Sequence, residues 1–291
     1  PNVCQVHEVG EADGQPYIVM ALVHGQTLAD ILKARKQPLP EEQAAMVVRK
    51  IALALASAHE KGIIHRDLKP ANVMFDRERK DIVVMDFGLA RAQQFGDARG
   101  TQSGVIMGTP AYMSPEQARG DAKGVGPAGD IFSLGVILYE LLTGVRPFSG
   151  TATEVIGQIL HIAPEPPSCR RPGIDSRIET VCLKAMAKDP AERFASMKEF
   201  AKAIDVILRA PVPAGGDVET ARASTTRREG DDQSTNTSSN LTEVFAALSA
   251  DRKQVRDETA AVVEAALAKH RTPRWVFTLI GLLFVAGLMT L

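Results

Sequence analysis

The sequence predicts an α+β fold in which a few short strands precede a mostly helical region. Two observations lead to this prediction: runs of β-branched residues occur early in the chain, and apolar residues recur at helical spacing later in it. The apolar fraction of 45% is sufficient for a hydrophobic core. A formal net charge of −1 provides no general basic field, so we expect no nucleic-acid partner.

The predicted elements follow one another along the chain. Tyr17–Leu22 is the first strand candidate, and Thr27–Arg35 is predicted to be a short helix with Thr27 as its N-cap. Glu41–Lys61 is predicted to be a long helix because apolar residues recur there every three or four positions. Asp130–Leu142 is apolar almost all round, which predicts a buried central helix with Asp130 as its N-cap. The other predicted elements are strands at Val73–Phe75 and Ile82–Met85 and helices near 152–161, 176–187 and 196–208.

Composition divides the chain into four stretches. Residues 1–209 have the composition of a globular domain, whereas residues 210–240 contain few large apolar side chains and are predicted to be a disordered linker. Residues 241–270 are rich in Ala, Glu, Leu and Lys and are predicted to form a juxtamembrane helix, which is either a spacer or a homodimerising element.

The last stretch, residues 275–291, contains seventeen residues and no charge, which is the lower limit for a transmembrane helix. The alternative is a buried core helix. Positive residues on the preceding flank favour a cytoplasmic location for the chain before it. We therefore expect a single-pass protein of the cell membrane that contacts the lipid bilayer through residues 275–291. The residues on this flank are Lys269, His270, Arg271 and Arg274.

Three short motifs occur in order within the globular part. His65–Asn72 reads His-Arg-Asp-Leu-Lys-Pro-Ala-Asn, which fits the catalytic-loop pattern H-R-D-x-x-x-x-N of protein kinases. Asp86-Phe87-Gly88 follows, and Ser114-Pro115-Glu116 comes later, in the place of Ala-Pro-Glu. Each motif alone is weak evidence, but the three in this order are highly specific.

With these motifs, residues 1–208 resemble the eukaryotic-type, membrane-anchored serine/threonine protein kinases of bacteria. Gly108–Ala118 and Asp130–Gly135 are especially similar to that group. The resemblance implies a protein-kinase-like fold, with a residual N-lobe and hinge over 1–25 and the helical C-lobe over 26–209. It also implies ATP and Mg²⁺ as cofactors and Ser/Thr hydroxyls of proteins as substrates.

The resemblance assigns the chemistry to four residues. Asp67 would orient the substrate hydroxyl and accept its proton, and Lys69 would lie beside the transferring phosphate. Asn72 and Asp86 would hold magnesium, a hard cation that favours oxygen ligands. Gly88 would give the turn after Asp86 its conformational freedom. Taken singly, Asp67 and Asp86 could each be ordinary turn residues.

Other residues are assigned to regulation. A phosphate on the activation segment would give Arg66 a dianionic partner, and Thr101 and Ser103 lie where related kinases autophosphorylate. The alternative is that both hydroxyls are ordinary polar loop residues. Thr109 would position the substrate near Asp67.

Structural roles are expected for a further set. His65 would pack near Phe87 in the core and would not act as a base. Glu116 and Arg193 would form an ion pair that joins the activation segment to the late helices, and Asp130 would also bond the catalytic-loop backbone.

Part of an ATP pocket is expected near the hinge. Met20 occupies the gatekeeper position, and backbone groups of Ala21 and Val23 would meet the adenine. Met74 would form the apolar floor under the base.

The family's Gly-rich loop, strand lysine and helix glutamate are not found, since Gly10 and Gly14 do not make G-x-G-x-x-G. The chain starts in mid-pattern, so we expect an N-terminally truncated kinase domain that is itself poorly active or inactive, with activity in the full-length parent. The alternatives are a pseudokinase, a membrane-tethered binding module, or a phosphotransferase acting on small molecules. The complete set of Asp67, Lys69, Asn72 and Asp86 favours an active kinase.

Overall fold

The computed structural model describes residues 2–12, 15–35, 37–87, 110–121 and 125–209, all within the unit Pro1–Val244. Within these ranges no helix is both long enough and apolar enough to cross a membrane. The predicted linker, juxtamembrane helix and transmembrane helix, at 210–240, 241–270 and 275–291, lie outside the described residues. Gly88, Thr101, Ser103 and Thr109 lie outside them as well.

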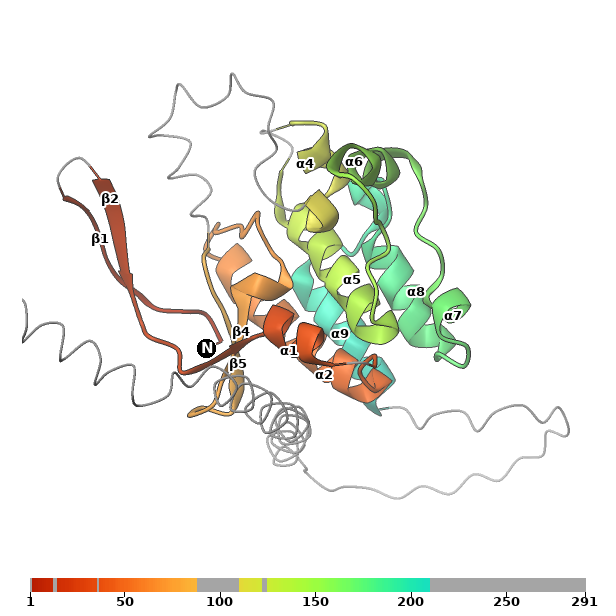
Figure 1. Cartoon of the computed structure of the whole chain (residues 1–291), viewed down its shortest axis with the longest axis horizontal. Helices are drawn as coiled ribbons and strands as arrows, with labels where there is room; N and C mark the ends of the chain where they lie inside the picture. The colour runs from red at the N-terminus through yellow and green to blue at the C-terminus, as the bar shows by residue number, and fades with distance from the viewer. Residues whose placement is uncertain (1, 13–14, 36, 88–109, 122–124, 210–291) are drawn as a thin grey trace, which may run out of the picture. The chain divides into compact units, whose positions relative to one another are not determined.

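Two small antiparallel sheets come from the first part of the chain. Strands β1 and β2 form a hairpin, and β3, β4 and β5 form a sheet in that order (Figure 1). Val3 pairs in parallel with Val84, so the chain before the hairpin runs beside β5. The strands are β1 (Val6–Ala12), β2 (Gln15–Met20), β3 (Gly25–Thr27), β4 (Val73–Asp76) and β5 (Asp81–Val84).

The predicted strands correspond to β2, β4 and β5, whereas β1 and β3 were not predicted. The register of the β3–β4 ladder explains a requirement for glycine. A Cβ added at Gly25 would lie 1.7 Å from the carbonyl oxygen of Phe75, so only glycine allows the two strands to pair at this point. The pairing places the segment just after β2 beside β4.

The helices form the larger part of the described structure. The predicted long, central and late helices are all confirmed, with ends that differ by a few residues. Thr27 caps α1 as predicted, accepting a hydrogen bond from the N–H of Asp30. The helices are α1 (Leu28–Ala34), α2 (Glu41–His59), α4 (Pro115–Ala118), α5 (Pro127–Thr143), α6 (Ala152–His161), α7 (Pro167–Arg170), α8 (Ser176–Ala185) and α9 (Met197–Arg209).

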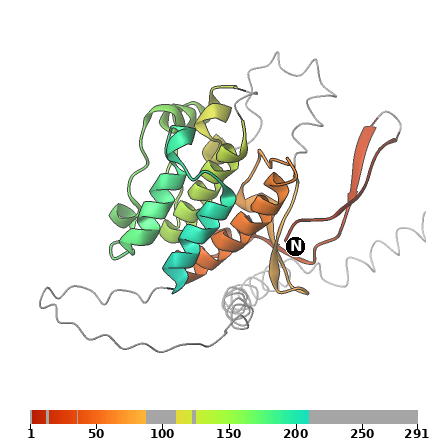
Figure 2. The ribbon, with the colours of Figure 1, turned by 180° about the vertical axis from the view of Figure 1, so that it is seen from behind.

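Helix α5 forms the centre of the core and packs against α2, α8 and α9 (Figure 1). Its burial on nearly every side confirms the prediction from its apolar sequence. An added Cβ at Gly135 would lie 2.8 Å from the Cβ of Ala185, so glycine permits the close approach of α8. Figure 2, the view from behind, shows α9 running along α2.

The predicted N-cap role of Asp130 is wrong. Helix α5 begins at Pro127, with Gly126 at the N-cap position, so Asp130 lies in the first turn of the helix. Pro at the first helical position favours this earlier start, because it needs no N–H partner there. The Asp130 carboxylate is therefore available for the loop that follows α2.

Candidate functional site

The loop between α2 and β4 is held in place through Asp130, which is 1% exposed. Its Oδ2 accepts hydrogen bonds from the backbone N–H of His65 and from Nε2 of His59, at 2.9 and 2.7 Å. Its Oδ1 accepts the backbone N–H of Arg66 at 2.9 Å. One buried carboxylate thus fixes two consecutive peptide units just before Asp67.

His65 is fully buried, and both of its ring nitrogens are engaged. Nε2 lies 2.9 Å from the carbonyl oxygen of Met85, and Nδ1 lies 3.3 Å from the backbone nitrogen of Asp67. Because carbonyl oxygen only accepts and amide nitrogen only donates, these contacts specify a neutral ring protonated at Nε2. Burial lowers the pKa of His65, although nearby Asp130 opposes the shift. The ring also packs against Phe87, with centroids 4.7 Å apart, so the contacts of His65 are those of a structural core residue.

Asp67, Lys69 and Asn72 form one polar cluster. The ammonium group of Lys69 lies 2.7 Å from Oδ2 of Asp67. The side-chain amide of Asn72 donates to the backbone oxygen of Asp67 at 2.8 Å and to its Oδ2 at 3.2 Å. The Asp67 side chain is about half exposed, so its carboxylate is held by Lys69 and Asn72 and is also accessible to solvent.

Asp86 is brought to this cluster by the strand that precedes it. The backbone N–H of Met85 donates to the carbonyl oxygen of Asn72 at 2.8 Å, which places the two chain segments side by side. Asp86 has a left-handed backbone with φ of 57°, an uncommon conformation for a residue with a side chain. Its carboxylate has no hydrogen bond or ion pair with any described residue.

Asn72 and Asp86 fit the ligand preferences of magnesium. The Asn72 side chain uses its amide nitrogen within the cluster, so its side-chain oxygen Oδ1 is left for a cation. Asp86 offers a carboxylate that has no partner among the described residues. Magnesium commonly binds one or two carboxylates and takes its other ligands from water and phosphate. The described residues contain no group of three or more His, Cys, Asp or Glu that could hold a metal.

The hinge residues Met20, Ala21 and Val23 lie at the end of β2 and just beyond it. Ala21 donates its N–H to the carbonyl oxygen of Gln5 at 2.8 Å, and its own carbonyl oxygen accepts from the thiol of Cys4 at 3.5 Å. The N–H of Val23 has no hydrogen bond with a described residue, which leaves it free to donate. Met74, on β4, is half-buried and pairs with Thr27 across the β3–β4 ladder, whereas His24, the residue after Val23, accepts the N–H of Arg77 at 2.9 Å.

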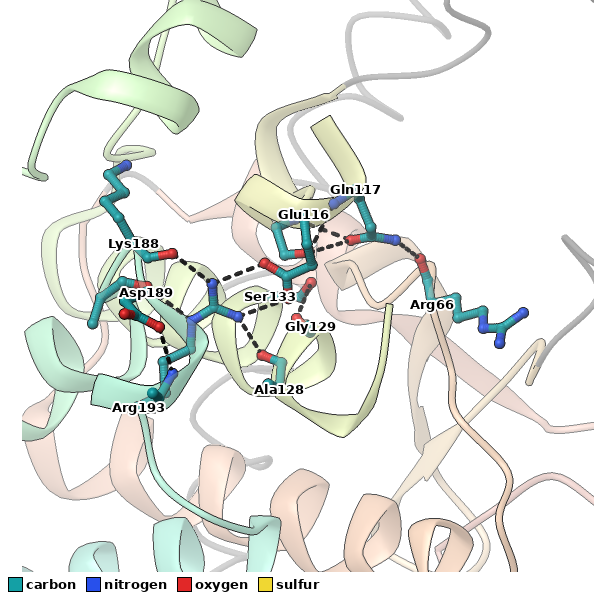
Figure 3. Close-up of polar contacts among 12 residues, drawn as sticks. Arg66, Glu116, Gln117, Ala128, Gly129, Ser133, Lys188, Asp189 and Arg193 are labelled. Atoms are coloured by element: carbon teal, nitrogen blue, oxygen red, sulfur yellow. Dashed lines mark hydrogen bonds and ion pairs between the residues drawn. The ribbon is translucent and has the colours of Figure 1, made fainter. Parts of the chain in front are cut away.

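Arg193 and Glu116 form a bidentate ion pair in the core (Figure 3). Both N···O distances are 2.9 Å, and each residue is 4% exposed. Burial alone would raise the pKa of Glu116, but the hydrogen bonds and charge of Arg193, together with hydrogen bonds from the Glu116 backbone and from Ser114, lower the pKa. Arg193 also donates to three backbone carbonyl oxygens, those of Ala128, Ala187 and Lys188. The pair fastens the short helix α4 to the late helices.

Sequence reasoning missed two residues of the site, His59 and Gln117. The amide nitrogen of Gln117 donates to the carbonyl oxygen of Arg66, and Figure 3 shows this bond reaching from α4 to the catalytic loop. Its amide oxygen closes a capping box with Ser114. The Ser-x-x-Gln pattern is a sequence signal for that box, but nothing in the sequence predicts the contact with Arg66.

Comparisons with known proteins agree with this geometry. The family model described as protein kinase domain matches residues 1–203. The serine/threonine-protein kinase PknB of Mycobacterium leprae is 43% identical over 206 residues, which cover 69% of this chain and 32% of that protein. A probable serine/threonine-protein kinase PknB of Bifidobacterium longum is 40% identical over 223 residues, covering 73% of this chain and 32% of that protein. The chain therefore spans about a third of the length of these curated relatives.

Solved structures show the same likeness. The kinase domain of PknI from Mycobacterium tuberculosis, as a double mutant, aligns with a TM-score of 0.58 and 29% identity over 72% of each chain. Rad53 in complex with AMP-PNP aligns with a TM-score of 0.57 and 26% identity, covering 72% of this chain and 51% of that one.

Proposed function

Because the chain belongs to the protein kinase family, with bacterial serine/threonine kinases of the PknB type as relatives, we propose that it transfers the γ-phosphoryl group of ATP to protein Ser/Thr hydroxyls. The observation that carries the proposal is the cluster of Asp67, Lys69 and Asn72 beside Asp86. Phosphoryl transfer requires mainly positioning and charge neutralisation, which this cluster supplies.

Each member of the cluster has a distinct role in the proposal. Asp67 receives the substrate hydroxyl at its exposed carboxylate and accepts its proton as the oxygen attacks the γ-phosphorus of ATP; the bond between that phosphorus and the bridging oxygen breaks, and ADP leaves. Lys69, already 2.7 Å from that carboxylate, offsets negative charge on the transferring phosphoryl group. Asn72 and Asp86 would hold magnesium, which supplies charge neutralisation at the phosphates when it is bound.

Nucleotide binding is assigned to the hinge. Met20 lines the adenine pocket, the Ala21 carbonyl and the Val23 N–H meet the edge of the base, and Met74 lies beneath it. The Val23 N–H, which has no partner among the described residues, and the half-buried side chain of Met74 support this assignment. The AMP-PNP complex of Rad53, a structural neighbour, is consistent with a site for ATP.

Regulation by phosphorylation is part of the proposal. Nε of Arg66 is buried and has no hydrogen-bond partner in the described part of the chain, so a phosphate acceptor would satisfy it. Thr101 and Ser103 are the proposed phosphorylation sites, and Thr109 is proposed to position the substrate. Homodimerisation, which would allow one copy to phosphorylate another, is proposed for residues 241–270.

Location at the membrane is also proposed. Residues 275–291 carry no charge and follow a positively charged flank, which supports a bilayer-spanning segment with the kinase domain on the cytoplasmic side. Fractionation of cells that express the full-length gene product tests this placement: recovery in the soluble fraction would contradict it.

The test of the activity compares the full-length gene product with two variants, Asp67→Asn and Asp86→Asn. Each should lower kcat for protein phosphorylation by about 100-fold or more, because general-base catalysis and metal binding each contribute on that order. Glu78→Gln is the matched control, since it also turns a carboxylate into an amide but lies exposed in the turn between β4 and β5. Phosphate found only on small molecules, or full activity in Asp67→Asn, would refute the proposal.

A further inference from the structure

The peptide unit between Arg66 and Asp67 is held at both of its polar ends. Its carbonyl oxygen, from Arg66, accepts a hydrogen bond from the amide nitrogen of Gln117 at 2.5 Å. Its N–H, from Asp67, donates to Nδ1 of His65 at 3.3 Å. The partners come from different elements, since Gln117 belongs to α4 and His65 to the loop itself. The plane of this peptide therefore cannot rotate while both contacts are kept.

The restraint acts at Arg66, whose backbone conformation is unfavourable by itself. Arg66 has a φ of 66°, in the left-handed region that residues with a Cβ rarely adopt. Such a conformation persists only when surrounding groups over-determine it. Asp130 holds the N–H of Arg66 and Gln117 holds its carbonyl, so the two side chains together maintain the turn that aims Asp67.

Gln117 is itself fixed in orientation. Its amide oxygen lies 3.0 Å from the backbone nitrogen of Ser114, so the amide nitrogen is the end that faces Arg66. The preceding residue, Glu116, is locked to Arg193 in the core. Helix α4 thus presents one donor to the catalytic loop from a rigid base (Figure 3).

We propose that Gln117 is a positioning residue for the phosphoryl transfer proposed above. By donating to the carbonyl of Arg66 it sets the peptide plane before Asp67, and so the direction of the Asp67 carboxylate. The arrangement makes the geometry of the catalytic loop depend on the correct folding of residues 110–118. This inference rests on the proposed function for its catalytic consequence but not for the contact itself.

The test uses Gln117→Glu in the full-length gene product. A glutamate keeps the oxygen that accepts from Ser114, since Glu is the usual partner in a capping box, but it cannot donate to Arg66 when ionised. We expect kcat to fall by about 10- to 100-fold, the range for small misplacements of a reacting group, with KM for ATP unchanged. The control is Arg119→Gln, which makes the same change in net charge on the exposed C-cap of the same helix.

Hydrogen–deuterium exchange of a peptide spanning residues 63–69 gives a second readout that does not need activity. Exchange should be faster in Gln117→Glu than in the wild type, and unchanged in Arg119→Gln. If the wild type proves inactive while exchange behaves as expected, the restraint of the catalytic loop by Gln117 is supported and the proposed function fails. Unchanged exchange in Gln117→Glu, or unchanged kcat in an active enzyme, overturns the inference.

Discussion

Replacement of Arg193 by Met gives the sharpest test of how the site is anchored to the core. The guanidinium group makes two bonds to Glu116 and three to backbone carbonyl oxygens, at distances from 2.7 to 3.2 Å. Methionine fills part of the same space and removes all five bonds. The Glu116 carboxylate would then remain buried without its cation, and three carbonyl groups would lose a donor.

The expected loss in unfolding free energy follows from the burial of this ion pair. Removing one partner of a buried ion pair costs about 3–5 kcal/mol, since the remaining charge has lost both solvent and partner. This corresponds to a change of roughly 10²- to 10⁴-fold in the folding equilibrium, at about 1.4 kcal/mol for each factor of ten. Such a loss would consume a large part of the typical margin of about 5–15 kcal/mol.

The assay is urea unfolding of the wild type, Arg193→Met, Glu116→Met and the double variant. The double variant should lose less stability than the sum of the two single variants, by about 0.5–3 kcal/mol, because it leaves no unpaired charge. The control is Lys198→Met, which breaks an ion pair with Glu60 whose side chains are 66% and 55% exposed. That loss should be about 0–1 kcal/mol.

Two results would refute the reasoning. The first is a cost for Arg193→Met as small as that for Lys198→Met, which would mean that burial does not decide the value of the pair. The second is strict additivity in the double variant, which would mean that Arg193 stabilises the fold through its backbone contacts and not through Glu116.

Two further predictions concern the hinge and the buried histidine. Gly25→Ala should destabilise the protein by about 1–3 kcal/mol through overpacking against the Phe75 carbonyl and should weaken ATP binding, both measurable by thermal shift with and without nucleotide. Because burial lowers the pKa of His65, the unfolded chain takes up a proton first as the pH falls below about 6.5, so unfolding free energy should decrease from pH 7.5 to 5.5. His65→Gln should reduce that pH slope, and the exposed control His161→Gln should not; equal slopes would contradict the assignment.

Much of the fold is predictable from local pattern. The apolar spacing in α2 and the all-round apolar sequence of α5 specify helices whose burial the structure confirms. The three-residue strand β3 carries no periodic signal, because its existence depends on the close approach of Gly25 to β4. That approach is a tertiary contact between segments far apart in the sequence.

The residues of the candidate site are also only partly predictable from the sequence. Asp67, Asn72 and Asp86 are found from motif spacing, because their chemistry demands those residue types. The role of Gln117 cannot be predicted from motif spacing, because its side chain reaches the carbonyl oxygen of Arg66 only when α4 packs beside the loop. Asp130 illustrates the conflict directly: local rules favour an N-cap, but the earlier start of α5 at Pro127 leaves its carboxylate to the loop.

The β4–β5 hairpin has a consequence for how the chain can vary in length. Val73 pairs with Val84, so the ladder closes next to the two proposed magnesium ligands, Asn72 and Asp86. Their separation is set by strand register and not by the turn at the other end of the hairpin. Residues inserted between Arg79 and Lys80, in that turn, would leave both ligands where they are, whereas a single residue inserted within either strand would displace one ligand relative to the other.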